Sequence, residues 1–111
     1  MAEMSTYERA IQIHQILIGA AHNRQVLTYP ILSKMIGVPA QGLAKHLDHL
    51  MRYCERTGLP PLTVLVVQTK SGRPGDGLTT VEELHRDRER VFAHDWYRMK
   101  PLTVTELQVD H

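Results

Sequence analysis

The chain has 111 residues, of which 42% are hydrophobic and 23% charged, values typical of one soluble domain. Its formal net charge of +1 excludes a protein that holds nucleic acid by bulk positive charge alone. A single cysteine, Cys54, excludes an internal disulfide. From the residues at the start and the short apolar runs we expect neither a signal peptide nor a membrane span of about 20 apolar residues. We therefore expect one cytoplasmic domain over residues 1–111.

The first helix pattern begins at Ser5, because Ser5 and Glu8 have the spacing of a capping box. The helix is expected to end in the polar stretch 22–25. Its apolar stripe comprises Tyr7, Ala10, Ile11, Leu17, Ile18 and Ala21. Ile13 and Ile16 widen this stripe, which indicates a helix buried on more than one side.

Two further helices follow in the pattern short, then long. Thr28 and Pro30 are typical of a helix start, and Gly37 of its end. A longer helix is expected over residues 40–57, stopped by Gly58. The apolar faces are Ile31, Leu32, Met35 and Ile36 in the short helix, and Leu43, Leu47, Leu50, Met51 and Cys54 in the long one. The short link between them predicts a sharp angle, as in a helix-turn-helix.

The segment "LTVLVVQT", residues 62–69, predicts a buried strand because it is rich in β-branched residues. The next residues, "KSGRPGDG" at 70–77, predict a loop. A helix-turn-helix followed by a strand and a loop is the outline of a winged helix. We expect a mainly α fold with a small β element: a winged helix-turn-helix with an additional C-terminal helix.

The C-terminal helix is expected over residues 80–100, since Thr80 and Glu83 form a second capping-box pattern and Pro101 ends it. Its apolar face comprises Val81, Leu84, Val91, Phe92, Trp96 and Met99. The aromatic residues Phe92, Trp96 and Tyr97 most often close a core at this spacing; the alternative is a surface for a partner. One more helical turn is expected after Pro101.

The stretch "LTYPILSKMIGVPAQGLAKHL" resembles the helix-turn-helix of the O6-alkylguanine-DNA alkyltransferase C-terminal domain and of the alkyltransferase-like proteins. The matching residues are Thr28, Tyr29, Leu32, Ile36 and Gly37. "GLPPLTVLVV" parallels the segment that leads into that family's active-site strand, and "KSGRPGDG" its glycine loop. The resemblance covers about residues 5–78 and implies a DNA-binding scaffold. The pattern is also similar to short bacterial or phage-borne proteins of unassigned function.

The chain departs from that family at its chemistry. Thr63, Val64, Leu65 and Val66 stand where the family carries Pro-Cys-His-Arg, and Gln41 stands where it carries the arginine that fills the place of a flipped base. Cys54 lies on the apolar stripe and is expected in the core. We therefore expect no catalytic residue, no alkyl transfer and no base flipping. The expected function is non-catalytic DNA binding.

The residues expected at double-stranded DNA are Tyr29, Ser33, Lys34, Gln41, Lys45, His49, Lys70 and Arg73. Gln41, Lys45 and His49 are four apart, on one polar face of the 40–57 helix, and the others are expected near phosphates or on the wing. Arg24 adds charge in a preceding loop. Three alternatives stay open: a solvated face, a protein-docking module such as a phage or bacterial regulatory or inhibitor protein, and an enzyme with an unrecognised site.

No metal or cofactor is expected. His46 and His49 are three apart with Asp48 between them, but the spacing places no third or fourth ligand beside them. "SGRPGDG" lacks the Gly-Lys-Ser/Thr ending of a phosphate loop, which favours a turn or a wing tip.

Overall fold

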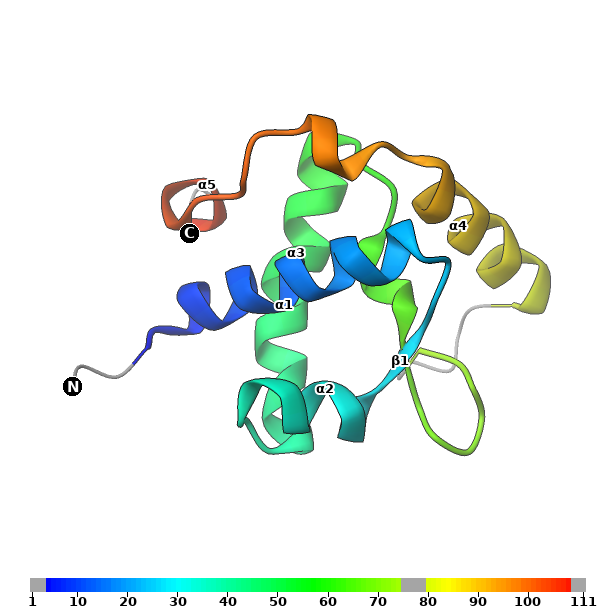
Figure 1. Cartoon of the computed structure of the whole chain (residues 1–111), viewed down its shortest axis with the longest axis horizontal. Coiled ribbons are helices and arrows are strands. Elements are labelled where there is room, and N and C mark those ends of the chain that lie inside the picture. The colour runs from blue at the N-terminus through cyan, green and yellow to red at the C-terminus, as the bar shows by residue number, and fades with distance from the viewer. Residues whose placement is uncertain (1–3, 75–79, 109–111) are drawn as a thin grey trace.

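Helix α1 (Thr6–His22) crosses the middle of the molecule, and the other helices pack around it (Figure 1). The structure is a computed structural model that describes residues 4–74 and 80–108. The other helices are α2 (Tyr29–Ile36), α3 (Leu43–Thr57), α4 (Val81–Ala93) and α5 (Val104–Gln108), and the strands are β1 (Leu27–Thr28) and β2 (Val66–Val67). Three short 3₁₀ turns complete the set: η1 (Ala40–Gly42), η2 (Leu62–Leu65) and η3 (Trp96–Arg98). The fold is thus mainly helical, with a very small sheet.

The start and the burial of α1 agree with the prediction from the sequence. The Ser5 hydroxyl accepts a hydrogen bond from the Glu8 amide at 3.1 Å, and the Glu8 carboxylate accepts one from the Ser5 amide at 3.0 Å. Both predicted partners of the capping box are therefore present. Ala10, Ile13 and Leu17 are 0% exposed, and α1 contacts all four other helices, η2 and η3. The prediction that α1 is buried on more than one side is confirmed.

The ends of α2 and α3 are also confirmed. The Thr28 hydroxyl accepts from the Ile31 amide at 3.2 Å, and Gly37 and Gly58 adopt the left-handed conformation with φ of 72° and 71°. The start of the long helix differs from the prediction. The Gly42 amide donates to the Pro39 carbonyl at 2.8 Å, which closes a tight 3₁₀ turn before α3. Gln41 therefore lies in η1 and not in the α-helix.

Several predicted core residues are exposed. Leu43, Leu47, Leu50 and Cys54 of α3 are buried, but Met51 is 41% exposed. In α2 only Leu32 is buried, whereas Ile31 and Met35 are 50% and 57% exposed. The reason is that α2 is a short helix at the lower end of the molecule and packs on the core along one narrow side (Figure 1).

The strand predicted over residues 62–69 is wrong in extent. Residues 62–65 form η2, in which Leu62 and Leu65, three apart on one side of the turn, are both 0% exposed. Only Val66 and Val67 form a strand, β2, which pairs in parallel with β1 in the register Leu27↔Val66. An apolar run does not by itself distinguish an extended segment from a helical turn, and here the turn buries its two leucines.

The loop after β2 is closed on itself. The Gln68 amide donates to the Arg73 carbonyl at 2.8 Å, and the Gly72 amide donates to the Gln68 carbonyl at 2.9 Å. A hairpin wing would need antiparallel strands, while the only sheet formed by the described residues is parallel. Residues 75–79, the rest of the expected wing, lie outside the described residues.

The C-terminal helix begins as predicted and ends early. Its capping box is confirmed by hydrogen bonds of 3.1 and 3.0 Å between Thr80 and Glu83. The helix stops at Ala93, because His94 turns to an extended conformation and the Trp96 indole donates to the Val91 carbonyl at 2.8 Å. This turn places Trp96 in the core, 4% exposed, while Tyr97 is 64% exposed. The single helical turn expected after Pro101 is α5.

Among residues 4–74 and 80–108, none of the helices combines the length and the apolar character that a membrane crossing requires. The radius of gyration is 13.3 Å. A folded domain of this length is expected to have about 13 Å, so the chain is compact.

Two glycine replacements test whether Gly37 ends α2 in the left-handed conformation. Gly37→Ala puts a side chain on left-handed backbone, and we expect it to lower the free energy of unfolding by about 1–2 kcal/mol. Gly19→Ala is the matched control: it lies inside α1, where an added Cβ would lie 3.8 Å from the Tyr97 hydroxyl, an ordinary contact. We expect this control to raise the free energy of unfolding by about 0.5–1 kcal/mol. Urea denaturation measures both, and equal effects would contradict the assignment of the turn.

Candidate nucleic-acid interface

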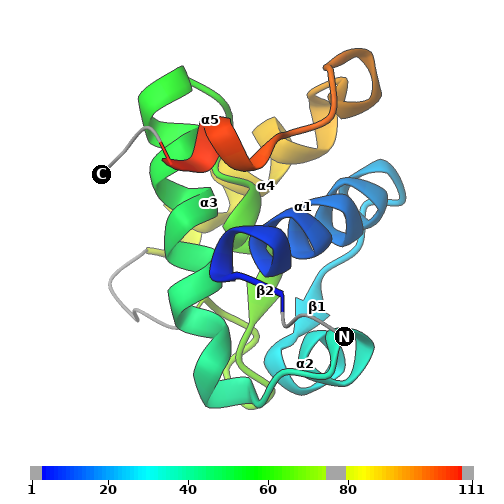
Figure 2. The same ribbon diagram turned by 90° about the vertical axis from the view of Figure 1, so that its left-hand side faces the viewer.

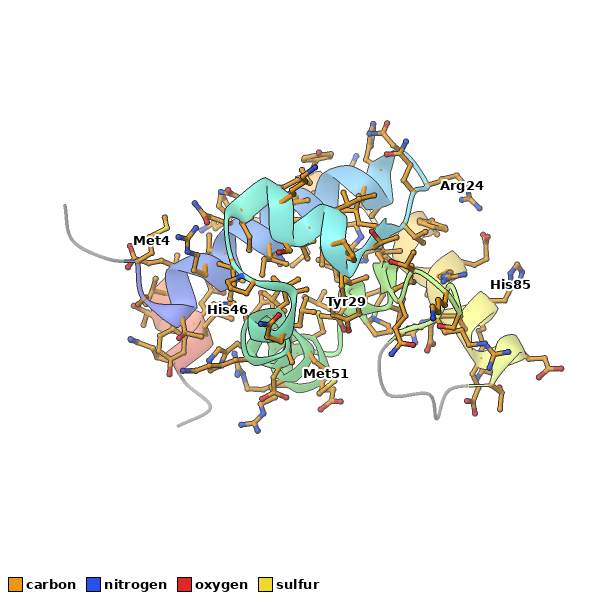
Figure 3. All side chains as sticks on the ribbon, turned by 90° about the horizontal axis from the view of Figure 1, so that it is seen from below. Met4, Arg24, Tyr29, His46, Met51 and His85 are labelled. Atoms are coloured by element: carbon orange, nitrogen blue, oxygen red, sulfur yellow. The ribbon has the colours of Figure 1, made fainter. Side chains whose placement is uncertain are left out.

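Three elements gather at one end of the molecule: α2, the start of α3, and the loop of residues 68–73. They occupy the lower end in two views at right angles (Figures 1 and 2). Seen from below, α2 lies in front and α3 points toward the viewer (Figure 3). The parallel pairing of β1 with β2 joins the residue before α2 to the start of the loop, which fixes the loop beside α2. We call this surface the α2–α3 face.

Four basic side chains of the α2–α3 face are exposed. They are Lys34 on α2, Lys45 on α3, and Lys70 and Arg73 on the loop. Within residues 4–74 and 80–108 none of the four forms an ion pair with a carboxylate. Neither α2 nor α3 has an acidic residue in its first turn. The positive ends of both helix dipoles are therefore not neutralised by their own side chains.

The other expected DNA contacts have mixed surroundings. Gln41 is exposed on η1, where it precedes the first turn of α3. Tyr29 is half-buried in the wall of a cavity, and the half-buried His49 ring has its centroid 4.7 Å from that of Tyr7. The Ser33 hydroxyl donates to the Val38 carbonyl, so its single proton serves the turn. Lys34, Gln41 and Lys45 are therefore exposed to solvent, whereas the Ser33 hydroxyl is hydrogen-bonded within the turn after α2.

Two arginines that the sequence did not single out hold the α2–α3 face together. Arg9 of α1 donates through Nη1 to the Ile36 carbonyl at 2.7 Å, which satisfies the end of α2. Arg88 of α4 donates through Nη2 to the Gly72 carbonyl at 2.8 Å, which fixes the loop. Both contacts join segments far apart in sequence, so no local sequence pattern predicts them.

Arg24, expected to add free charge, is engaged elsewhere. Its Nη2 lies 2.8 and 2.9 Å from the two Glu89 carboxylate oxygens, and its guanidinium carbon lies 4.8 Å from the centre of the Phe92 ring. This arginine ties the end of α1 to α4. The pair is exposed, so its main effect is on geometry rather than on stability.

A cavity of about 420 Å³ opens between α3 and the segment 61–64. Tyr29, Thr63 and Val64 are part of its wall, and its charged lining residues, among those described, are Asp48 and Glu55. Asp48 is paired with Arg52 at 3.1 Å, which partly offsets its charge, so the two carboxylates disfavour an anion such as phosphate in this cavity only weakly. An anion is therefore better placed beside the exposed lysines of the α2–α3 face than inside the cavity.

The cavity wall has no reactive thiol. Thr63 and Val64 are part of this wall, whereas Cys54 is 2% exposed in the core and is not part of it. Burial, as the largest cause, raises the pKa of the Cys54 thiol, while a hydrogen bond with the Leu62 backbone acts in the opposite direction. A raised pKa keeps the thiol protonated and unreactive. Within the described residues, no three His, Cys, Asp or Glu side chains are placed to hold a metal ion.

The chain matches no known protein family, no curated protein and no solved structure. The resemblance to the alkyltransferase scaffold therefore rests on the residues named above alone.

A buried histidine lies on α1, away from the α2–α3 face. His14 is 5% exposed, and its Nε2 has no hydrogen-bond partner among the described residues. Burial lowers the pKa of His14 to about 4, and the charge of Glu106 opposes this shift. The folded chain therefore holds His14 neutral at a pH where the unfolded chain would bind a proton.

This difference in pKa predicts a pH-dependent stability. The stabilising contribution is complete above pH 6.5 and is lost as the pH falls from 6.5 to about 4, since the unfolded chain binds the proton first. The whole loss is on the order of 3 kcal/mol. We expect His14→Phe to remove most of this dependence and to leave stability at pH 7 unchanged or raised, because the variant has no unpaired buried nitrogen. Urea unfolding of both proteins across this pH range measures it; equal slopes would contradict the assignment.

Proposed function

We propose that the chain binds double-stranded DNA without catalysis, through the α2–α3 face. The observation that carries the proposal is the sharp turn from α2 through Gly37 and Pro39 into η1 and α3. This turn exposes Gln41 and Lys45 at the start of the longer helix. A polar helix start without a side-chain cap, with exposed polar side chains beside it, is what a groove-binding helix presents to DNA.

In this proposal α2 and α3 act as a helix-turn-helix, and the loop 68–73 acts as a wing. Gln41 reads a base edge, since its amide both donates and accepts hydrogen bonds. Lys34 and Lys45 contact phosphates on either side of the groove, and Lys70 and Arg73 contact the backbone beside it. The hydrogen bond from Arg88 to Gly72 supports this arrangement, because it holds the loop in one position before DNA arrives.

The absence of a reaction is part of the proposal. Alkyl transfer in the family that the chain resembles uses a cysteine, and the single cysteine of this chain, Cys54, is buried in the core and is not part of the cavity wall. Burial raises the pKa of its thiol, which keeps the thiol protonated. In this proposal the cavity therefore performs no alkyl transfer.

The test is the affinity for a labelled duplex, measured by fluorescence anisotropy over a series of salt concentrations. We expect Gln41→Ala with Lys45→Ala to weaken binding by about tenfold or more, and to reduce the dependence of log K on log salt by about one. Lys100→Gln is the matched control, because it removes the same charge from an exposed lysine in the segment after η3, which lies at the end of the molecule opposite α2 (Figure 1). We expect this control to bind as the parent does. An unchanged affinity in the double variant at low salt would overturn the proposal.

A second candidate, a protein-docking module, is favoured by one specific observation. Ile31 and Met35 are one helical turn apart on α2 and are both at least half exposed, at 50% and 57%. Adjacent exposed apolar side chains are typical of protein interfaces. The salt series separates the two candidates: a docking module that has lost DNA binding shows no salt-dependent duplex affinity in the parent protein.

A further inference from the structure

We propose that a second cavity, between α1 and the segment 96–102, binds a small aromatic carboxylic acid. The cavity has a volume of about 310 Å³ and lies away from the α2–α3 face, beside η3 and the chain that follows it. Pockets for small molecules begin at about 300 Å³. The volume therefore admits a compact ligand with one ring system.

The body of the cavity is apolar. Ile11 and Ile18 of α1 form one wall, and Trp96, Met99 and Leu102 form the other. Aromatic rings pack well against indole and aliphatic side chains. This composition favours a ligand whose main part is an aromatic ring, and disfavours a sugar or another ligand rich in hydroxyl groups.

One charge selects the sign of the ligand. Of the described residues in the cavity wall, Lys100 alone carries a formal charge at pH 7. No Asp or Glu of residues 4–74 and 80–108 forms an ion pair with it. The nearby Glu106 does not line the cavity, and its Oε1 accepts hydrogen bonds from the amide and hydroxyl of Thr103 at 3.1 and 3.0 Å. The charge of Glu106 nevertheless acts on His14 in this wall, so an anion is favoured at the Lys100 side of the cavity.

His14 provides an independent indication of a ligand. Its side chain belongs to the cavity wall, is 5% exposed, and has an Nε2 atom without a partner in the described chain. Its ring centroid lies 6.4 Å from those of both Trp96 and Tyr53. Buried polar atoms are nearly always hydrogen-bonded, so an unpaired one marks a place where a partner is missing. The Nε2 atom itself has less than 1 Å² of exposed surface, so a polar group of a bound acid reaches it only when the His14 ring turns toward the cavity.

The experiment uses the fluorescence of Trp96, which is the single tryptophan of the chain and lies in the cavity wall. The probes are phenylacetate, 2-phenylethanol and 2-phenylethylamine, which share a ring and differ in charge. We expect a saturable change with phenylacetate, and weaker binding of the alcohol and the amine. Chemical-shift mapping with phenylacetate is expected to move the amides of residues 11–18 and 96–102.

Two exposed lysines provide the variant and its control. We expect Lys100→Gln to weaken phenylacetate binding up to about fivefold, the range of a solvent-exposed ion pair, and to leave 2-phenylethanol unaffected. Lys45→Gln removes an equal charge from the α2–α3 face. We expect it to change neither the binding of phenylacetate nor that of 2-phenylethanol.

Three results would overturn the proposal: no saturable signal with phenylacetate, equal binding of all three probes, or equal effects of the two lysine variants. Because DNA binding depends on Lys45 and not on Lys100, the failure of either proposal leaves the other intact.

Discussion

The burial of α1 is the constraint on which the rest of the structure depends. Ala10, Ile13 and Leu17 are fully buried on this helix, and α2, α3, α4 and α5 all pack against it. Alanine at positions 10, 20 and 21 keeps the helix narrow, so that its neighbours approach closely. Because these neighbours share one central helix, the α2–α3 face and the cavity at residues 96–102 are held in a fixed relation on different parts of it.

The α2–α3 face is held by hydrogen bonds to backbone carbonyls in addition to its apolar contacts. Helix α2 buries a single leucine, and its C-terminal end is held by the Ser33 hydroxyl on Val38 and by the Arg9 guanidinium on Ile36. The loop 68–73 is held in the same way by Arg88. These contacts leave the lysines of the face unpaired within the described chain, which is the physical basis for assigning phosphate binding to them.

Local signals in the sequence predicted local structure well. The two capping boxes and the left-handed glycines at 37 and 58 fixed the helix ends, because each of these signals acts within one turn of chain. The predictions were wrong where contacts between segments distant in sequence determine the local structure. Packing of Leu62 and Leu65 turned an expected strand into η2, and the indole of Trp96 ended α4 before residue 100. The exposure of Lys45 was expected from its spacing with Gln41, and that of Lys34 and Lys70 from their places in the motif. Neither cavity was expected, since each is built from separate segments.

We propose that DNA lies on the α2–α3 face, and chemical-shift mapping of the labelled chain with a duplex at low salt tests this proposal most directly. We expect the largest amide shifts within residues 29–49 and 68–73, and we expect added salt to reverse them. The proposal would be contradicted by a duplex that leaves these amides unmoved, or by shifts that concentrate in α4 and α5.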